Sequence, residues 1–372
     1  MGSAIKIPKS PISHPQFHRL LLAWFDRCRR DLPWRRSRDP YAIWVSEIML
    51  QQTQVATVIP YFQRFLEAFP TVADLAAAKE SEVLRLWEGL GYYRRARDLH
   101  RAAQQIIADH DGRIPQEPAV LAALPGIGRY TVGAILSQAF DQRLPILETN
   151  SQRVLCRLFG QRGDPRRGGT RRWLWEMAEA LLPARRVGAF NQALMELGAL
   201  VCTPTAPRCE ACPVYALCTA RRRGIQEQIP ERSDPPAAVA IQEAAVVLYR
   251  GRRVLFVQRP QQGRWAGLWE FPHAPLEKGE RPEETAARLL PQLTGMDGAI
   301  RSELLTLRHS VTHHRITMIC FQAHYQGGSF RSDFYRRARW VAPAELKAFP
   351  VSAPQRRVAQ FLLQPNRQLN LF

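Results

Sequence analysis

Hydrophobic residues recur every three or four positions from His14 to about Ala220, which is the spacing of amphipathic helices. Prolines interrupt this pattern and mark where one helix ends and the next begins: Pro33, Pro40, Pro70, Pro115, Pro125, Pro145 and Pro183. The pattern therefore predicts an all-helical domain over residues 1–220.

The pattern changes between Thr219 and Ala240, where the sequence reads TARRRGIQEQIPERSDPPAAVA. Charged residues and prolines leave few apolar side chains to bury, which is typical of a linker. We therefore expect residues 221–240 to join two domains.

Beyond this linker the hydrophobic pattern favours strands. The runs AAVVLYR and RRVLFVQRP are rich in β-branched and aromatic residues and are separated by a turn at Gly251. Further elements are predicted as an acidic helix from about Pro282 to Leu293, a strand from about Ile316 to Tyr325 and a helix from Pro354 to Leu363. Together they predict an α+β domain over residues 241–364, followed by a tail at 365–372.

Composition narrows the class of protein. Of the 372 residues, 46% are hydrophobic and 23% are charged, which excludes a wholly disordered or collagen-like chain. No apolar run approaches the ~18 residues of a membrane span. The first residues, MGSAIKIPKSPISHP, hold no apolar segment for secretion. We therefore expect a cytoplasmic protein with no membrane partner.

Charge indicates a polyanionic partner. Lys and Arg together number 52 and Asp and Glu 33, which gives a formal net charge of +19. Only five of the basic residues are lysines: Lys6, Lys9, Lys79, Lys278 and Lys347. This balance favours nucleic acid, although a ribosome-associated or membrane-surface protein would also be basic.

Four cysteines lie close together in the segment CTPTAPRCEACPVYALC, namely Cys202, Cys209, Cys212 and Cys218. Four thiolates can surround one compact centre, and soft sulfur ligands suit zinc or an iron–sulfur cluster. The alternative is chance clustering of buried cysteines in a reducing compartment. The spacing indicates a metal site, and its long first gap resembles the [4Fe–4S] loop of the endonuclease III and MutY glycosylases.

The segment LPGIGRYTVGAI combines a glycine turn with the start of a helix. Gly126 and Gly128 allow a tight turn, and the helix after them offers unpaired backbone N–H groups to an anion such as phosphate. A plain corner between two helices is the alternative. The segment resembles the helix–hairpin–helix of DNA repair enzymes, which holds DNA phosphate without reading the bases.

Two glutamates suit chemistry on a glycosidic bond, which needs an acid for the leaving group and a negative group beside the oxocarbenium ion. Glu47 lies within the apolar stretch YAIWVSEIMLQQT, where burial would raise its pKa and favour the acid role. Glu148 precedes a predicted helix in PILETNSQRVL. For either residue alone, a solvated or capping carboxylate is the simpler interpretation.

Several motifs taken together resemble the A/G-specific adenine DNA glycosylases of the MutY type: PWR, WVSEIMLQQT, EGLGYYRRA, LPGIGRYT, FNQALMELGALVCTP and the cysteine loop. The resemblance covers nearly the whole chain. It implies an all-α helix–hairpin–helix glycosylase domain with a [4Fe–4S] loop at 202–218, followed by an α+β Nudix-like domain. It also implies a monomer that acts in base-excision repair on nucleoid DNA.

The resemblance assigns roles to individual residues. It implies that Glu47 protonates adenine N7 and that Tyr130 and Asn150 support the second carboxylate. Arg35 and Gln192 match positions that line the adenine pocket. Gln52 and Tyr92 match side chains that push into the base stack and offset the cost of flipping out a base. The implied substrate is duplex DNA containing 8-oxoguanine:A or G:A.

Two positions refine this expectation. The second carboxylate of the family is an aspartate, whereas this chain has Glu148, whose extra methylene moves the charge by more than about 1 Å. Related bifunctional glycosylases carry a lysine nucleophile where this chain has Tyr130. No lysine lies between Lys79 and Lys278. We therefore expect a monofunctional enzyme that leaves an abasic site.

The second domain resembles a Nudix domain without its metal-binding carboxylates. The matching stretch runs from Arg288 to Gly295 and holds no glutamate, so Mg²⁺ hydrolysis is not expected. In the family this fold recognises 8-oxoguanine through a Phe-Ser-His loop. The match here is Val311, Thr312 and His313, of which Thr312 and His313 keep the polar groups.

Alternatives to this function remain open from sequence. One is a DNA-binding mismatch sensor that has lost efficient catalysis because of Glu148, and another is a glycosylase for a different mismatch.

The last residues, QLNLF, resemble a peptide that docks on the DNA sliding clamp through Gln368, Leu369, Leu371 and Phe372. The alternative for this tail is that it folds back on its own domain.

Overall fold

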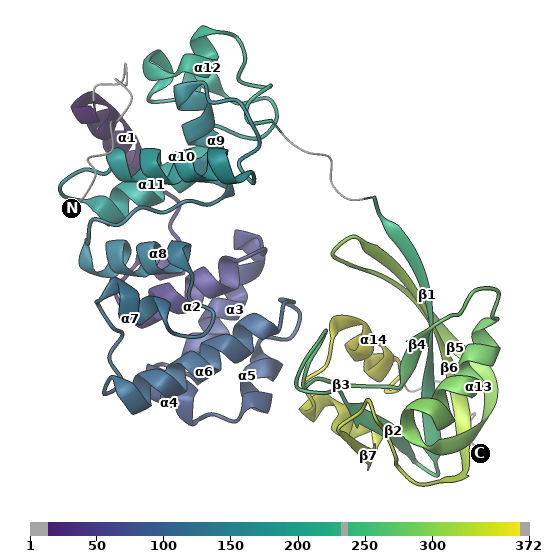
Figure 1. Cartoon of the computed structure of the whole chain (residues 1–372). Coiled ribbons are helices and arrows are strands. Elements are labelled where there is room, and N and C mark those ends of the chain that lie inside the picture. Colours follow the sequence, from purple (N-terminus) through teal and green to yellow (C-terminus); the bar gives the residue numbers. More distant parts are fainter. Residues whose placement is uncertain (1–13, 232–236, 365–372) are drawn as a thin grey trace. The chain divides into compact units, whose positions relative to one another are not determined.

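The computed structural model describes residues 14–231 and 237–364 (Figure 1). The helices of the N-terminal half are α1 (His14–Cys28), α2 (Pro40–Leu50), α3 (Val55–Ala68), α4 (Val72–Ala77), α5 (Glu80–Leu86), α6 (Arg94–Asp109), α7 (Pro118–Ala122), α8 (Arg129–Phe140), α9 (Thr149–Phe159), α10 (Gly168–Ala180), α11 (Val187–Leu200) and α12 (Thr219–Arg222). Short 3-10 turns also occur: η1 (Pro33–Arg35), η2 (Cys209–Ala211) and η3 (Tyr215–Leu217). No strand lies within residues 14–231, which confirms the helical prediction.

The chain divides into two compact units. The first comprises Met1–Ala76 and Arg101–Asp234, and the second comprises Ala77–His100 and Pro235–Phe372. Residues 232–236, within the predicted linker, lie outside the described residues, so the course of the linker stays a prediction.

Buried helices form the centre of the first unit. α2 is apolar on nearly all sides, and its residues from Tyr41 to Met49 are buried, as expected for a helix in the core. Asp39 starts this helix by accepting hydrogen bonds from the backbone N–H groups of Tyr41 and Ala42. α2 packs on α8, α8 on α11, and α11 on α9. Side chains that are far apart in the sequence therefore meet between these four helices.

α9 and α11 approach each other closely at Gly198. A Cβ atom at this position would lie 2.6 Å from the Cβ of Asn150, closer than real side chains come. Only glycine leaves this space, so Gly198 sets the position of Asn150 against α11.

A mixed sheet of seven strands forms the core of the second unit within its described residues. The strands are β1 (Val239–Arg250), β2 (Arg253–Gln258), β3 (Trp269–Glu270), β4 (His273–Pro275), β5 (Met296–Val311), β6 (His314–Gly328) and β7 (Arg337–Val341). Their order is β3-β2-β1-β6-β5, with β4 paired to β1 and β7 to β2. β1 and β6 are parallel, whereas β5 and β6 form an antiparallel hairpin.

Helices pack on this sheet through two separate hydrophobic clusters. Even-numbered residues of β1 from Ala244 to Leu248 pack with α13 (Pro282–Thr294). Odd-numbered residues from Ala245 to Tyr249 pack with α14 (Ala353–Phe361), near the 3-10 helix η4 (Pro343–Ala348). Because successive strand residues point to opposite faces, burial on both faces explains why AAVVLY, from Ala244 to Tyr249, is continuously apolar. The predicted helix-and-sheet domain is confirmed.

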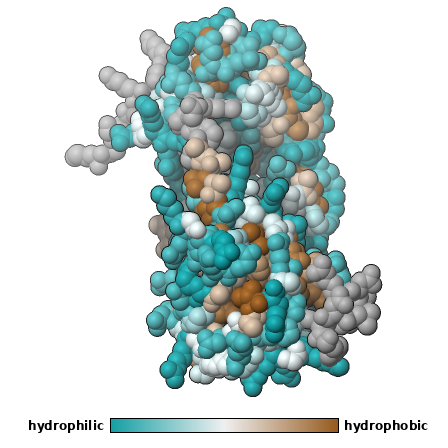
Figure 2. Space-filling view, turned by 90° about the vertical axis from the view of Figure 1, so that its right-hand side faces the viewer, coloured by the Kyte–Doolittle hydropathy of each residue, from teal (hydrophilic) through white to brown (hydrophobic). Residues whose placement is uncertain are grey.

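The face of the molecule in Figure 2 is mostly hydrophilic, with hydrophobic residues in limited areas. Among the described helices, none combines the length and the apolar character needed to cross a membrane. The tail residues Gln368, Leu369, Leu371 and Phe372 lie outside the described residues.

Candidate active site

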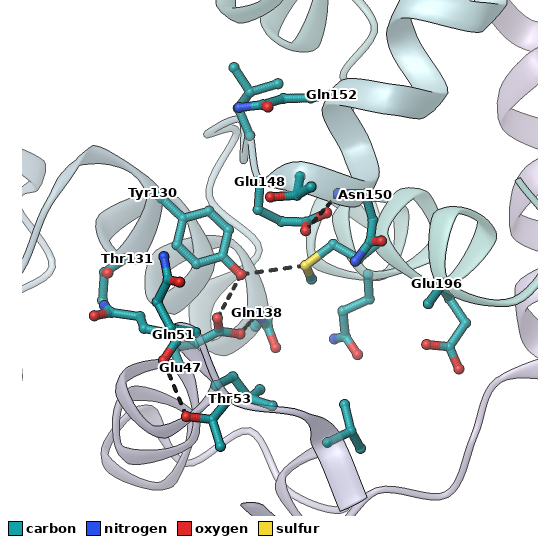
Figure 3. Close-up of a pocket in the computed structure, with 18 of the residues that line it drawn as sticks. Glu47, Gln51, Thr53, Tyr130, Thr131, Gln138, Glu148, Asn150, Gln152 and Glu196 are labelled. Carbon is teal, nitrogen blue, oxygen red and sulfur yellow. Dashed lines mark hydrogen bonds between the residues drawn. The ribbon is translucent and has the colours of Figure 1, made fainter. Parts of the chain in front are cut away.

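A pocket of about 800 Å³ opens in the first unit, between α2, α8, α9 and α11 (Figure 3). This volume is in the range of small-molecule sites. Its lining includes most of the residues that the sequence assigns to catalysis and to the base: Arg35, Glu47, Gln52, Gly126, Gly128, Tyr130, Glu148, Asn150 and Gln192. The fold thus brings together residues that are spread over more than 150 positions of the sequence.

Glu47 lies on α2 and is only 4% exposed. Its Oε2 accepts a hydrogen bond of 2.7 Å from the Tyr130 hydroxyl, and its Oε1 accepts one of 2.9 Å from Gln138 Nε2. Burial raises the pKa of Glu47, although these hydrogen bonds and the charge of Arg35 oppose the rise. Glu47 therefore keeps its proton to higher pH than an exposed glutamate, as a general acid requires.

Glu148 is the N-cap of α9. Its Oε2 and Oε1 accept hydrogen bonds of 2.8 and 2.7 Å from the backbone N–H groups of Asn150 and Ser151. Burial raises the pKa of Glu148, and these N–H groups together with Arg153 oppose the rise. The helix N-terminus thus stabilises a negative charge at this wall of the pocket.

Tyr130 lies between the two carboxyl groups in Figure 3. Burial and the two nearby carboxylates hold the pKa of its hydroxyl well above the usual value, so it acts as a donor. The family resemblance implies that Tyr130 supports Glu148, whereas its hydroxyl donates to Glu47 and also contacts Met195 Sδ at 3.4 Å. This difference arises because α8 packs against α2 and brings Tyr130 to Glu47.

Asn150 supports Glu148 through its backbone rather than its side chain. The side-chain Oδ1 of Asn150 instead accepts a hydrogen bond of 2.9 Å from Arg153 Nη2. The same guanidinium donates to the backbone oxygens of Gly198 and Cys202, both at 2.7 Å. Arg153 therefore connects the wall of the pocket to Cys202, the first cysteine of the cysteine loop.

Arg35 and Arg30 both bind Glu196, which is fully buried. Arg35 donates to both Glu196 oxygens, at 3.1 and 2.9 Å. Burial opposes ionisation of Glu196, but the bonds from Arg30 and Arg35 lower its pKa to about 2. This pairing fixes the Arg35 guanidinium at the edge of the pocket.

The sequence analysis did not find Glu196 or Gln138. Glu196 follows Gln192 by four positions on α11, the spacing that places two side chains on one helix face. The sequence therefore contained a signal that Glu196 lies beside the predicted pocket residue Gln192. Gln138 carries no such signal, because its partner Glu47 comes from a different helix.

Gln192 lies on α11, and the other remaining pocket residues lie in turns. Gln52 has a φ of +59° in the turn between α2 and α3, which is uncommon for a residue other than glycine. Gly126 has a φ of +75° in the turn before α8. Gly128 is the N-cap of α8, and an added Cβ there would meet no atom within 4 Å.

The four cysteines line a second, small cavity in the first unit, together with Arg157 and Arg221. Arg157 is buried, and its Nη1 donates to Cys202 Sγ at 3.4 Å while its backbone oxygen accepts from Cys218 Sγ at 3.4 Å. Within the described residues no group of three or more Cys, His, Asp or Glu side chains is arranged to hold a single metal ion. The candidate metal ligands in this lining are all cysteines, and a set of sulfur ligands suits an iron–sulfur cluster.

Comparisons with known proteins identify the family of this chain. Adenine DNA glycosylases of Rattus norvegicus and Homo sapiens are each 36% identical to this chain over 92% of its length, covering 77% and 73% of their own. The chain belongs to the adenine DNA glycosylase family. A member from Buchnera aphidicola subsp. Schizaphis graminum is 36% identical over 69% of this chain and 74% of its own.

Family models match both halves of this adenine DNA glycosylase family member. Residues 45–180 match the HhH-GPD superfamily base excision DNA repair protein, and residues 244–360 match the NUDIX domain. The solved structure of a thermostable thymine-DNA glycosylase is 31% identical, with a TM-score of 0.51, and covers 56% of this chain and 97% of its own. The family and fold expected from the sequence are confirmed.

Other residues that the resemblance to this family singles out lie in the second unit. Tyr92 is 51% exposed in the turn before α6, with a φ of +47°. Thr312 and His313 are exposed at the tip of the β5–β6 hairpin, where Thr312 has a φ of +53°. On α13, the Arg288 guanidinium donates hydrogen bonds to both carboxylate oxygens of Glu280.

Proposed function

We propose that this protein hydrolyses the N-glycosidic bond of adenine paired with 8-oxoguanine or guanine in duplex DNA. The observation that carries the proposal is the pocket in which buried Glu47, hydrogen-bonded to Tyr130, faces a second buried carboxyl, Glu148. Glycosidic cleavage needs one carboxyl that donates a proton and a second whose negative charge is stabilised, and the backbone N–H groups of Asn150 and Ser151 would supply that stabilisation at Glu148. Membership of the adenine DNA glycosylase family supports adenine as the base.

The reaction would begin with proton donation from Glu47 to N7 of the flipped-out adenine. The bond between C1′ and N9 then breaks, and its electron pair leaves with the neutral base. The Glu148 carboxylate stabilises the positive charge on the sugar. Water adds to C1′ and gives its proton to the Glu47 carboxylate, which restores the acid and leaves an abasic site.

We infer roles in DNA binding from the same positions. Arg35 and Gln192 would hold the adenine, and Gln52 and Tyr92 would fill the space left in the base stack. The N–H groups at the turn of Gly126 and Gly128 would bind a phosphate, since an added Cβ at Gly128 would project into open space. The net charge of +19 supports a large contribution from phosphate contacts.

We further propose that the enzyme does not cut the DNA strand. Strand cleavage through a Schiff base needs an amine close to C1′. No lysine is among the described residues that line the pocket, and the residue between the two carboxyl groups is Tyr130.

The second unit would read the opposite base. Thr312 and His313 are exposed at a hairpin tip, and the Thr312 hydroxyl, which donates to the Val311 backbone oxygen at 2.7 Å, could still accept a hydrogen bond from 8-oxoguanine. The lack of glutamates from Arg288 to Gly295 supports recognition rather than metal-dependent hydrolysis.

Cys202, Cys209, Cys212 and Cys218 would hold a [4Fe–4S] cluster. When bound, the cluster supplies four sulfur–iron bonds that fix the loop and a centre capable of one-electron transfer. Their shared cavity and the Arg157 hydrogen bond to Cys202 Sγ support this assignment. Iron and sulfide analysis of the purified protein tests it.

The tail from Gln368 to Phe372 would tether the enzyme to a sliding clamp on the nucleoid.

A single-turnover assay on duplexes with 8-oxoguanine:A, G:A and G:T tests the function. We expect adenine release from the first two, with strand breaks only after alkali. The likeness to a thymine-DNA glycosylase structure gives a second candidate, thymine release from G:T. Tight binding to 8-oxoguanine:A without release of any base would instead indicate a mismatch sensor. Glu47→Gln serves as the control that binds but does not cleave.

A further inference from the structure

We propose that Gln138 is a positioning residue that orients Glu47 and stabilises the carboxylate that Glu47 becomes when it donates its proton. This inference rests on the proposed function, in which Glu47 is the acid. Gln138 and Tyr130 lie on the same helix, α8, and both side chains reach Glu47 (Figure 3).

The two oxygens of Glu47 are held by different donors. The Tyr130 hydroxyl donates to Oε2 at 2.7 Å, and Gln138 Nε2 donates to Oε1 at 2.9 Å. An ionised carboxylate only accepts hydrogen bonds, so it is the amide nitrogen of Gln138 that faces an ionised Glu47. Two donors on one helix fix the plane of the carboxyl group. Each oxygen keeps a second lone pair for the substrate.

Few charges compete with these hydrogen bonds. Arg35 from η1 faces Glu47, but both of its terminal nitrogens also bind Glu196. Glu148 lies on the far side of Tyr130 and acts on that hydroxyl. α3, which also packs on α2, presents only apolar residues on its buried side: Val58, Phe62 and Phe65. Hydrogen bonds therefore contribute strongly to the stability of ionised Glu47.

The contribution of Gln138 changes during the reaction. In the resting enzyme, burial raises the pKa of Glu47, which favours the protonated form. As the proton moves to the leaving base, negative charge develops on Glu47, and a hydrogen bond to a charged group is stronger than one to a neutral group. Gln138 thus contributes more in the transition state than in the ground state, which is the condition for accelerating the step.

The test compares Gln138→Met with the parent protein in single-turnover excision from 8-oxoguanine:A over a range of pH. Methionine has nearly the same length but no N–H donor. Loss of one hydrogen bond to the carboxylate raises the pKa of Glu47, so the fall of the rate at alkaline pH should move upward by about one pH unit. The maximal rate should fall roughly 10-fold, because the developing charge is less stabilised.

The matched control is Gln142→Met. Gln142 follows the end of α8 and donates to the backbone oxygen of Gln116, at 2.9 Å and outside the pocket. This variant should keep both the maximal rate and the pH profile of the parent. Gln138→Leu repeats the test with a side chain of different shape.

A second measurement does not depend on catalysis. Carbon-13 NMR of protein labelled at the glutamate carboxyl carbon, with Glu47 assigned by its loss in Glu47→Gln, gives the titration midpoint directly. A higher midpoint in Gln138→Met supports the proposal, and an unchanged midpoint overturns it. A higher midpoint with an unmoved rate profile supports the hydrogen bond but contradicts Glu47 as the acid, and with it the proposed function.

Discussion

At the scale of single residues, the burial that suits Glu47 to its proposed role as an acid also lowers the stability of the fold when Glu47 ionises. Its carboxyl group is buried, which raises its pKa above the roughly 4.3 of an unfolded chain. Below about pH 4.3 the group is protonated in both states, and its contribution to stability is fully present. As pH rises through the raised folded pKa, the native state must ionise a buried group, and that stability is lost.

Glu47→Gln should therefore abolish excision and remove this loss of stability. The amide keeps the shape of the side chain but cannot donate the proton or ionise. Relative to the parent, its unfolding free energy should rise between pH 3.5 and 8.5, by about 1.4 kcal/mol for each unit of pKa elevation. Urea denaturation at both pH values measures the change. The same pH dependence in parent and variant would contradict a raised pKa at Glu47.

Glu148 combines a charge with a helix cap, and substitutions separate the two. Glu148→Asp keeps both, since aspartate is a favoured N-cap, so excision should be preserved or faster. Glu148→Gln keeps one of the two cap acceptors but no charge, so it should lose excision while the melting temperature falls less than in Glu148→Ala. Glu148→Ala should lose excision and also about 1 kcal/mol of stability. Normal excision by the glutamine variant would show that another anion stabilises the sugar.

At the scale of elements, the turn before α8 shows why two glycines in one motif are not equivalent. Gly126 has a φ of +75°, a conformation that other residues adopt at a cost. Gly128 has an ordinary φ of −99° and open space beside it. Gly126 is thus needed for the conformation of the turn, whereas Gly128 leaves space for a group, such as a phosphate, that approaches the N-terminus of α8.

Gly126→Ala should lower stability by roughly 1–2 kcal/mol, the cost of a side chain in the left-handed region. Gly128→Ala should leave the melting temperature nearly unchanged and weaken binding to undamaged duplex DNA, because its methyl group would stand where a phosphate approaches. Thermal unfolding and fluorescence anisotropy measure the two effects. Equal effects of both variants on stability would refute this division.

Elements with regular patterns could be predicted from the sequence, and irregular ones could not. β1 and β2 each contain a continuous apolar run, and α13 begins and ends within one residue of the prediction. β5 was missed because register shifts near Asp297, Ile300 and Glu303 interrupt its alternation of apolar and polar residues. In the site, local motifs identified Glu47 and Glu148, but the contact of Gln138 with Glu47 depends on the packing of α8 against α2.

At the scale of the whole molecule, the proposed chemistry and the proposed recognition of the opposite base belong to different units of the chain. The carboxyl groups, the pocket and the cysteine cavity all belong to the first unit. Thr312 and His313 belong to the second, at the tip of a hairpin whose base is buried under α13 and α14. A change at this tip should therefore leave the pocket and the fold intact.

Changing Thr312 and His313 together to alanine should reduce the preference for 8-oxoguanine:A over G:A by about 10-fold or more, since two polar contacts to the base are each worth roughly 1 kcal/mol. Affinity for undamaged duplex should stay nearly constant, because phosphate contacts dominate it. Gln326→Ala is the matched control, as Gln326 is exposed near the opposite end of the same hairpin. Single-turnover rates on both duplexes give the preference. An unchanged ratio in the double variant would mean that the opposite base is read elsewhere in the chain.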